Sequence, residues 1–183
     1  MFRYELKFVT DEKNTIYILN WLLKNSSLKK KYNNRFVNSV YFDTPDYKFA
    51  KDNLIGLSNR KKIRIRWYSS SNNEFITPVL ETKNKIGRLS NKTKIIIKKP
   101  DSINPNIKYN DLTKIIYNNF YLLNKINFYP NLQPTLQVNY LREYYESANN
   151  IRVTIDRNIN FYETKRNMRL FNKNKYKYYK NII

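Results

Sequence analysis

The sequence predicts an α+β domain in which a few helices cover an antiparallel sheet of six or more strands. Strict two-residue alternation in several stretches places apolar side chains on one face of each strand and charged side chains on the other. Only a few segments have apolar residues at helical spacing. With 183 residues and no internal repeat or linker, we expect one domain over residues 1–183.

The expected elements follow in order along the chain. Alternation predicts a first strand at 2–9, and Thr10 and Asp11 are suitable caps for a helix to about Lys24 with an apolar stripe. Its stripe consists of Ile16, Leu19, Leu22 and Leu23. The remaining elements are a strand at 37–43, a turn or short helix at 45–54, strands at 61–68, 75–85 and 92–98, a helix at 111–123, and strands at 135–146 and 151–156.

Charged residues share one face of several strands. Lys62, Arg64 and Arg66 stand two apart, and Glu81 and Lys83 repeat this pattern on the next strand. Two arrangements remain open: an open sheet whose charged face meets solvent, or a closed sheet whose charged face lines a lumen. Because cations that repel one another are rarely concentrated without an anion, the pattern favours the lumen.

Composition limits the possible chemistry. The 35 Lys and Arg residues against 14 Asp and Glu give a net charge of +21, which indicates a polyanionic partner, although an AT-rich genome would also enrich Lys. The absence of Cys and His excludes Cys/His zinc sites, disulfides and His bases. Two glycines are too few for a glycine-rich phosphate loop.

No apolar stretch approaches the roughly 20 residues of a membrane-spanning helix, and the amino terminus lacks the apolar segment of a signal peptide. A cytoplasmic location is therefore the expectation. The sequence leaves the oligomeric state open.

Six motifs occur in order, with sensible spacing, from about residue 2 to about residue 162. They are RYELKF at 3–8, NSVYFDTPD at 38–46, RKKIRIRWY at 60–68, LETKNK at 80–85, NYLREYYES at 139–147 and IRVTIDRNINFY at 151–162. Together they resemble the VTC polyphosphate polymerase domain of the triphosphate tunnel metalloenzyme superfamily.

The resemblance implies an antiparallel β tunnel, a closed or nearly closed barrel of about eight strands. Such a tunnel binds ATP or another triphosphate with Mn²⁺ or Mg²⁺ and passes the terminal phosphate to polyphosphate. The phosphate ligands that the resemblance implies are Lys7, Arg64, Arg66, Lys83, Lys92, Arg142 and Arg152. Among them, the implied catalytic residues are Arg64, Arg66, Lys83 and Arg142.

Carboxylates on the charged faces are the candidate metal ligands, because Mg²⁺ and Mn²⁺ take oxygen ligands. These are Glu5 and Glu81, and a salt bridge from Glu81 to Lys83 or a neighbouring Arg is the alternative. We expect Asp43 and Asp156 to fix turns or pair with Arg. For Tyr41, Phe42 and Trp67, the expectation is core packing.

The family's domains end with a strand that carries a metal-binding Glu in a Glu-x-Lys context, and no equivalent is found here. We expect residues 169–179 either to close the sheet as a substitute strand or to leave an open edge with weak metal binding. In both cases we expect phosphate binding with slow turnover of ATP. Two other functions remain: a nucleic-acid-binding module and a catalytically inactive polyphosphate-binding module. No specific nucleic acid is favoured, because the cations alternate with apolar residues along strands.

Overall fold

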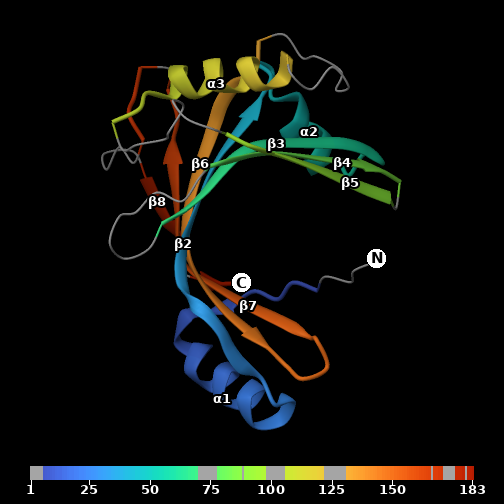
Figure 1. The fold of residues 1–183 in the computed structure, drawn as a ribbon, viewed down its shortest axis with the longest axis vertical. Helices are drawn as coiled ribbons and strands as arrows, with labels where there is room; N and C mark the ends of the chain where they lie inside the picture. Colours follow the sequence, from blue (N-terminus) through green and yellow to red (C-terminus); the bar gives the residue numbers. More distant parts are fainter. Residues whose placement is uncertain are drawn as a thin grey trace.

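The computed structural model describes residues 6–69, 78–87, 89–97, 106–121, 131–165, 167–170, 176–179 and 181–183. These residues form a seven-stranded antiparallel sheet in the order β5-β4-β3-β2-β6-β7-β8, with helices on its outer side (Figure 1). Its strands are β2 (Lys29–Asp43), β3 (Asn59–Ser69), β4 (Val79–Ile86), β5 (Leu89–Ile96), β6 (Gln133–Glu146), β7 (Arg152–Glu163) and β8 (Tyr176–Tyr179). The α+β class is confirmed.

Four helical segments and a small second sheet complete the described fold. The helical segments are η1 (Glu12–Asn14), α1 (Thr15–Ser26), α2 (Lys48–Leu54) and α3 (Tyr109–Tyr121). The second sheet pairs β1 (Thr10–Asp11) with β9 (Asn181–Ile182). Within the described ranges, no helix has both the length and the apolarity to cross a membrane.

The large sheet is bent into an arch. In Figure 1, β2 and β6 run along its back, while β3–β5 above and β7 below curve towards the same side. The pairing of β2 with β6 shifts register between Lys30 and Tyr32 and again between Tyr32 and Arg35. Such irregularities bend a strand and increase its twist, which accounts for the curvature.

The predicted closure into a barrel is not confirmed. Strands β5 and β8 are the two edges of the described sheet and do not pair with each other. Of the first expected strand, 2–9, residues 6–9 are exposed and belong to no strand, while residues 2–5 lie outside the described ranges. As far as the described residues extend, the arch is open on its concave side.

The expected substitute strand does form within residues 169–179. Strand β8 pairs with β7, with Tyr176 opposite Tyr162 and Tyr179 opposite Ile159. It extends one edge of the sheet without reaching the other. The tail therefore adds a strand but does not restore a barrel.

The main core lies on the convex face, between the sheet and α3. The strand residues that alternate away from the charges are buried there, including Ile63, Ile65 and Trp67 of β3. Helix α3 covers them with Leu112 and Ile116. As expected, Phe42 and Trp67 belong to this core.

Helix α1 covers a smaller cluster at the other end of the arch. Leu19 and Leu22 pack there against Leu28, Tyr145 and Ile155. The predicted stripe is therefore half right, because its other two members, Ile16 and Leu23, are exposed. The helix begins later than predicted, since the expected caps pair with β9.

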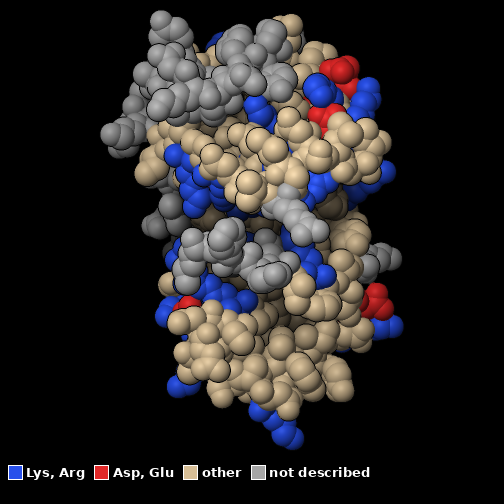
Figure 2. Space-filling model, turned by 90° about the vertical axis from the view of Figure 1, so that its right-hand side faces the viewer, with Lys and Arg blue, Asp and Glu red and all other residues tan. Residues whose placement is uncertain are grey.

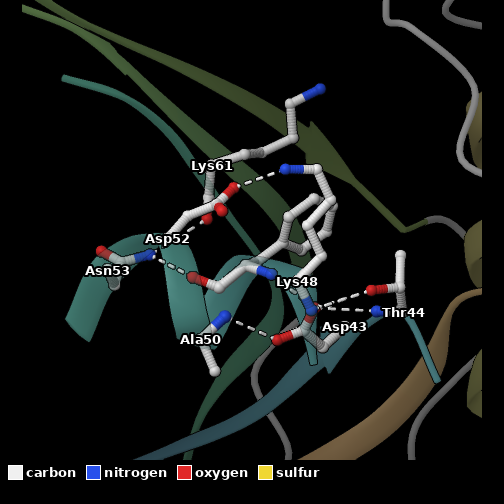
Figure 3. A network of polar contacts seen from close by, with 8 residues as sticks. Asp43, Thr44, Lys48, Ala50, Asp52, Asn53 and Lys61 are labelled. Atoms are coloured by element: carbon white, nitrogen blue, oxygen red, sulfur yellow. Dashed lines mark hydrogen bonds and ion pairs between the residues drawn. The ribbon is translucent and has the colours of Figure 1, made fainter. Parts of the chain in front are cut away.

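Asp43 joins the end of β2 to the start of α2, as its predicted role in fixing a turn requires (Figure 3). Its buried carboxylate accepts hydrogen bonds from the backbone N–H groups of Thr44, Phe49 and Ala50, each at 2.8 Å. An anion at a helix amino terminus also interacts favourably with the helix dipole. The carboxylate thus fixes the angle at which α2 leaves the sheet.

We predict that Asp43→Ala lowers the free energy of unfolding by about 2–4 kcal/mol, because three N–H groups lose their acceptor. Asp52→Ala is the matched control: it removes a carboxylate from the same helix, where Asp52 pairs with Lys48 at 2.9 Å. That ion pair is partly exposed and should contribute less than about 1 kcal/mol. Urea unfolding measures both, and equal losses would contradict the role of Asp43.

Candidate anion-binding site on the concave face

The concave face of the arch collects the charged side chains that alternate with the core residues. Register places Arg64 of β3 opposite Tyr41 of β2 and Glu81 of β4, so the three side chains lie in one row. The next β3 residue on this face, Arg66, lies opposite Ser39. Figure 2 looks onto the open side of the arch and shows Lys and Arg gathered along a hollowed band across its middle.

Glu81 is the centre of this row. Its Oε2 accepts from Arg64 Nη2 at 2.6 Å and from Arg64 Nε at 2.7 Å, and its Oε1 accepts from Lys92 Nζ at 2.8 Å. Arg66 Nη1 lies 4.0 Å from Oε2. Three cations therefore converge on a carboxylate whose side chain is only 7% exposed.

This arrangement controls the ionisation of Glu81. Burial acts to raise the pKa of the carboxyl, but the hydrogen bond from Lys92 and the charge and hydrogen bond of Arg64 outweigh it and lower the pKa from 4.5 to about 2. Glu81 is thus an anion at any physiological pH. It neutralises part of a strongly positive cluster.

Hydroxyl groups hold the two central arginines in place. Arg64 Nη1 donates to the Tyr41 hydroxyl at 3.0 Å, and Arg66 donates to Ser39 Oγ at 3.3 Å and to the Tyr140 hydroxyl at 3.5 Å. Burial raises the pKa of Tyr140 to about 12, against the opposing effect of Arg66. Its hydroxyl therefore keeps its proton and remains able to donate one hydrogen bond.

Arg142 stands further along the same face, on β6. Its Nε and Nη2 donate to the two carboxylate oxygens of Asp156, each at 2.6 Å, and its guanidinium carbon lies 5.2 Å from the centre of the Tyr140 ring. Burial would lower the pKa of Arg142, but Asp156 and Tyr140 more than reverse this and raise it. The predicted pairing of Asp156 with an Arg is confirmed.

Lysines lie side by side at the β4–β5 end of the face. Lys83 is directly opposite Lys62 on one side and Lys92 on the other. Directly opposed like charges destabilise a sheet unless an anion compensates them. The predicted salt bridge of Glu81 forms with a neighbouring Arg, Arg64, and Lys92 joins it. The other predicted partner, the exposed Lys83, makes no ion pair within the described ranges.

Not every predicted site residue joins this group. Lys7 is exposed and lies outside the strands. Arg152 pairs with Glu146 at 2.9 Å, near the start of β7 and several rows from Arg64. Glu5 lies outside the described residues.

Sequence reasoning missed the contribution of tyrosines. Tyr41, predicted to pack in the core, is half-buried on the concave face, where it contacts Arg64. The alternation along the strand could have revealed this position. Tyr41 stands between the core residues Val40 and Phe42 and must therefore face the opposite side of the sheet. Ser39 faces the same side as Tyr41 and also contacts an arginine.

The predicted metal ligands are the carboxylates of Glu5 and Glu81. No three acidic side chains come together within the described ranges. Glu81, the candidate that can be located, has both oxygens engaged by cations. A metal ion held by Glu81 would first have to displace a guanidinium or an ammonium group.

The sequence was compared with models of known protein families. The family model described as VTC domain matches residues 2–182, which is nearly the whole chain. No curated protein matches the sequence.

The depressed pKa of Glu81 predicts a pH-dependent contribution to stability. The folded-state pKa of about 2 lies below the value of 4.5 for a free carboxyl, so the contribution is complete above about pH 4.5 and is lost as the pH falls towards 2. It should amount to the order of 3 kcal/mol.

Urea unfolding of the wild type and of Glu81→Gln across this pH range measures the effect. The difference in unfolding free energy between the two proteins should shrink on acidification. Glu163→Gln, which changes an exposed carboxylate at the end of β7, is the control and should track the wild type. A wild-type-minus-Glu81→Gln difference that is independent of pH would contradict the assigned ion cluster.

Proposed function

The chain belongs to the VTC domain family, and on this basis we propose that it is a phosphotransferase related to polyphosphate polymerases. ATP or another triphosphate binds the concave face, and its terminal phosphate passes to a polyphosphate chain. The observation that carries this proposal is the convergence of Arg64, Arg66 and Lys92 on one buried carboxylate, beside lysines that have no ion-pair partner in the described ranges.

The arrangement suits phosphate chemistry. Arginine forks bind phosphate oxygens through paired charge-assisted hydrogen bonds, and Arg64 and Arg66 are already oriented by Tyr41, Ser39 and Tyr140. Phosphoryl transfer depends mainly on positioning and on fixed positive charge. A rigid cationic face supplies both.

The reaction balances without a protein base. An anionic oxygen at the end of the polyphosphate attacks the terminal phosphorus of the triphosphate. The bond from that phosphorus to its bridging oxygen breaks, and the nucleoside diphosphate leaves with the electron pair. Because the attacking oxygen carries no proton, the absence of His from the chain is no obstacle.

Mn²⁺ or Mg²⁺ remains part of the proposal as an ion that arrives with the triphosphate. Such ions bind through substrate phosphates as readily as through protein carboxylates. No three acidic side chains come together among the described residues, and Glu5 and Glu81 remain the proposed carboxylate ligands of the ion.

A catalytically inactive polyphosphate-binding module would use the same face. For the concave face, a nucleic-acid-binding module is less well supported, because base stacking needs accessible aromatic faces beside the cations. The Tyr41 and Tyr140 rings are instead contacted by the guanidinium groups of Arg64 and Arg142, at 5.8 and 5.2 Å.

We predict that Arg64→Gln and Arg66→Gln each weaken triphosphate binding by about 1.5–3 kcal/mol, because each removes charged hydrogen bonds to phosphate. Arg169→Gln is the matched control. Arg169 is exposed, and its backbone forms an isolated β-bridge with Lys108 near the start of α3. The control variant removes the same charge away from the concave face. Calorimetric titration with a non-hydrolysable ATP analogue measures binding. Equal losses of affinity in all three variants would mean that only the net charge of the protein matters and would contradict the assigned site.

We also predict that long-chain polyphosphate competes with the ATP analogue for the same site. Duplex DNA should bind only weakly, and its binding should disappear at moderate salt. Polyphosphate and the ATP analogue should contact the same arginines, so Arg66→Gln should weaken the binding of both ligands. Competition is measured at two salt concentrations. Salt-resistant binding of single-stranded DNA, with quenching of tyrosine fluorescence, would instead support the nucleic-acid module.

A further inference from the structure

Five aliphatic side chains are exposed at the β4–β5 end of the arch. They are Leu54, Ile55, Leu57, Ile86 and Leu89, with exposed fractions of 86%, 71%, 44%, 65% and 69%. We call them the apolar tip. Single exposed aliphatic residues are common, but a group of five is not.

The members of the apolar tip are brought together by two adjoining turns. Ile86 and Leu89 lie directly opposite each other where β4 turns into β5, and the Gly87 N–H of that turn donates to Ser58 O, at 2.9 Å, in the loop after α2. Gly56 and Gly87 have φ values of +73° and +59°, in the left-handed region. The only two glycines of the chain therefore both serve these turns.

Cations flank the apolar tip. Arg60 and Lys85 lie directly opposite each other on β3 and β4, one residue from the turn, and Lys51 is exposed on α2. None of the three makes an ion pair within the described ranges, whereas the nearby Asp52 is already paired with Lys48 at 2.9 Å. The charge around the tip is therefore net positive, even though Asp46 lies close enough to Lys51 for the two charges to interact.

We propose that the apolar tip docks this protein onto the surface of a lipid membrane with anionic headgroups. Aliphatic side chains on projecting turns insert below the headgroups, and flanking Lys and Arg side chains contact lipid phosphates. A second copy of the chain fits less well, because it carries the same net charge of +21. An anionic bilayer supplies both the apolar interior and the opposite charge.

This inference is independent of the proposed phosphotransfer. By alternation along β4, Ile86 lies on the core side with Leu80, whereas Arg64 and Glu81 lie on the concave side. The flanking Arg60 and Lys85 share the parity of Arg64 and Glu81 and stand at the outer end of the same strands. When the apolar tip is inserted into the membrane, Arg64 and Arg66 stay on the other side of the sheet from the inserted side chains. Failure of one proposal would leave the other standing.

Vesicle co-sedimentation of the full chain tests the proposal, with phosphatidylcholine vesicles that contain or lack phosphatidylserine. The tip variant is Leu54→Ser with Ile55→Ser, and the control is Ile16→Ser with Ile151→Ser. The control removes two aliphatic side chains of comparable exposure, 73% and 58%, at the opposite end of the arch. Neither variant alters the charge of the protein, and their melting temperatures establish that both fold.

The wild type and the control should bind vesicles that contain phosphatidylserine, and the tip variant at least about tenfold more weakly. The single variant Ile55→Trp should also bind these vesicles. The emission of the introduced Trp should shift to the blue, which reports that this side chain has entered the apolar layer. Equal binding of tip variant and control would mean attraction by charge alone and would overturn the proposal. Absence of vesicle binding by the wild type would overturn it as well and would favour an acidic protein as the partner.

Discussion

The concave face depends on one interaction, the contact of the Glu81 carboxylate with the cations of three neighbouring residues. Arg64, Arg66 and Lys92 come from β3 and β5, so without Glu81 between them the sheet would bring like charges together in a partly buried place. The cost of burying Glu81 is offset by two charged partners at 2.8 Å or less. Asp156 performs the same task for Arg142.

The same strands build both the scaffold and the site. Strict alternation sends Ile63, Ile65 and Trp67 into the core beneath α3, and therefore sends Arg64 and Arg66 to the opposite face. Curvature then decides what that face can do. On a flat sheet these arginines would be solvated, but the irregular β2–β6 pairing bends the sheet so that the cations face a hollow.

Most elements could be predicted because their periodicity is local. The strands near β3, β4 and β6 and the helices α2 and α3 follow directly from the spacing of residues such as Ile63 and Leu112. Closure could not be predicted in this way, because it depends on whether the edges β5 and β8 meet, and no local pattern reports that. The alternation at 2–9 is genuine, yet residues 6–9 find no partner strand.

Partners across the sheet were equally hard to predict. Lys83 stands two residues from Glu81 on one strand and was a natural partner, but the register places Arg64 opposite Glu81, and Lys92 of β5 also reaches it. Register is a property of two strands together. The role of Tyr41 was missed for the same reason, since its contact with Arg64 exists only across the β2–β3 pair.

The occupied state of the arginines also constrains how an anion reaches them. Arg64 directs Nε and Nη2 to Glu81 and Nη1 to Tyr41, so all three of its nitrogens are engaged. If a triphosphate binds this face as proposed, its phosphates would meet the exposed Lys83 first, in the lysine row beside Glu81. It can then compete with Glu81 for Arg64 and Lys92, because a phosphate group carries more charge and more acceptor oxygens than a carboxylate. In the proposed function, Glu81 would thus be an internal counter-ion that keeps the cations ordered until a phosphate replaces it.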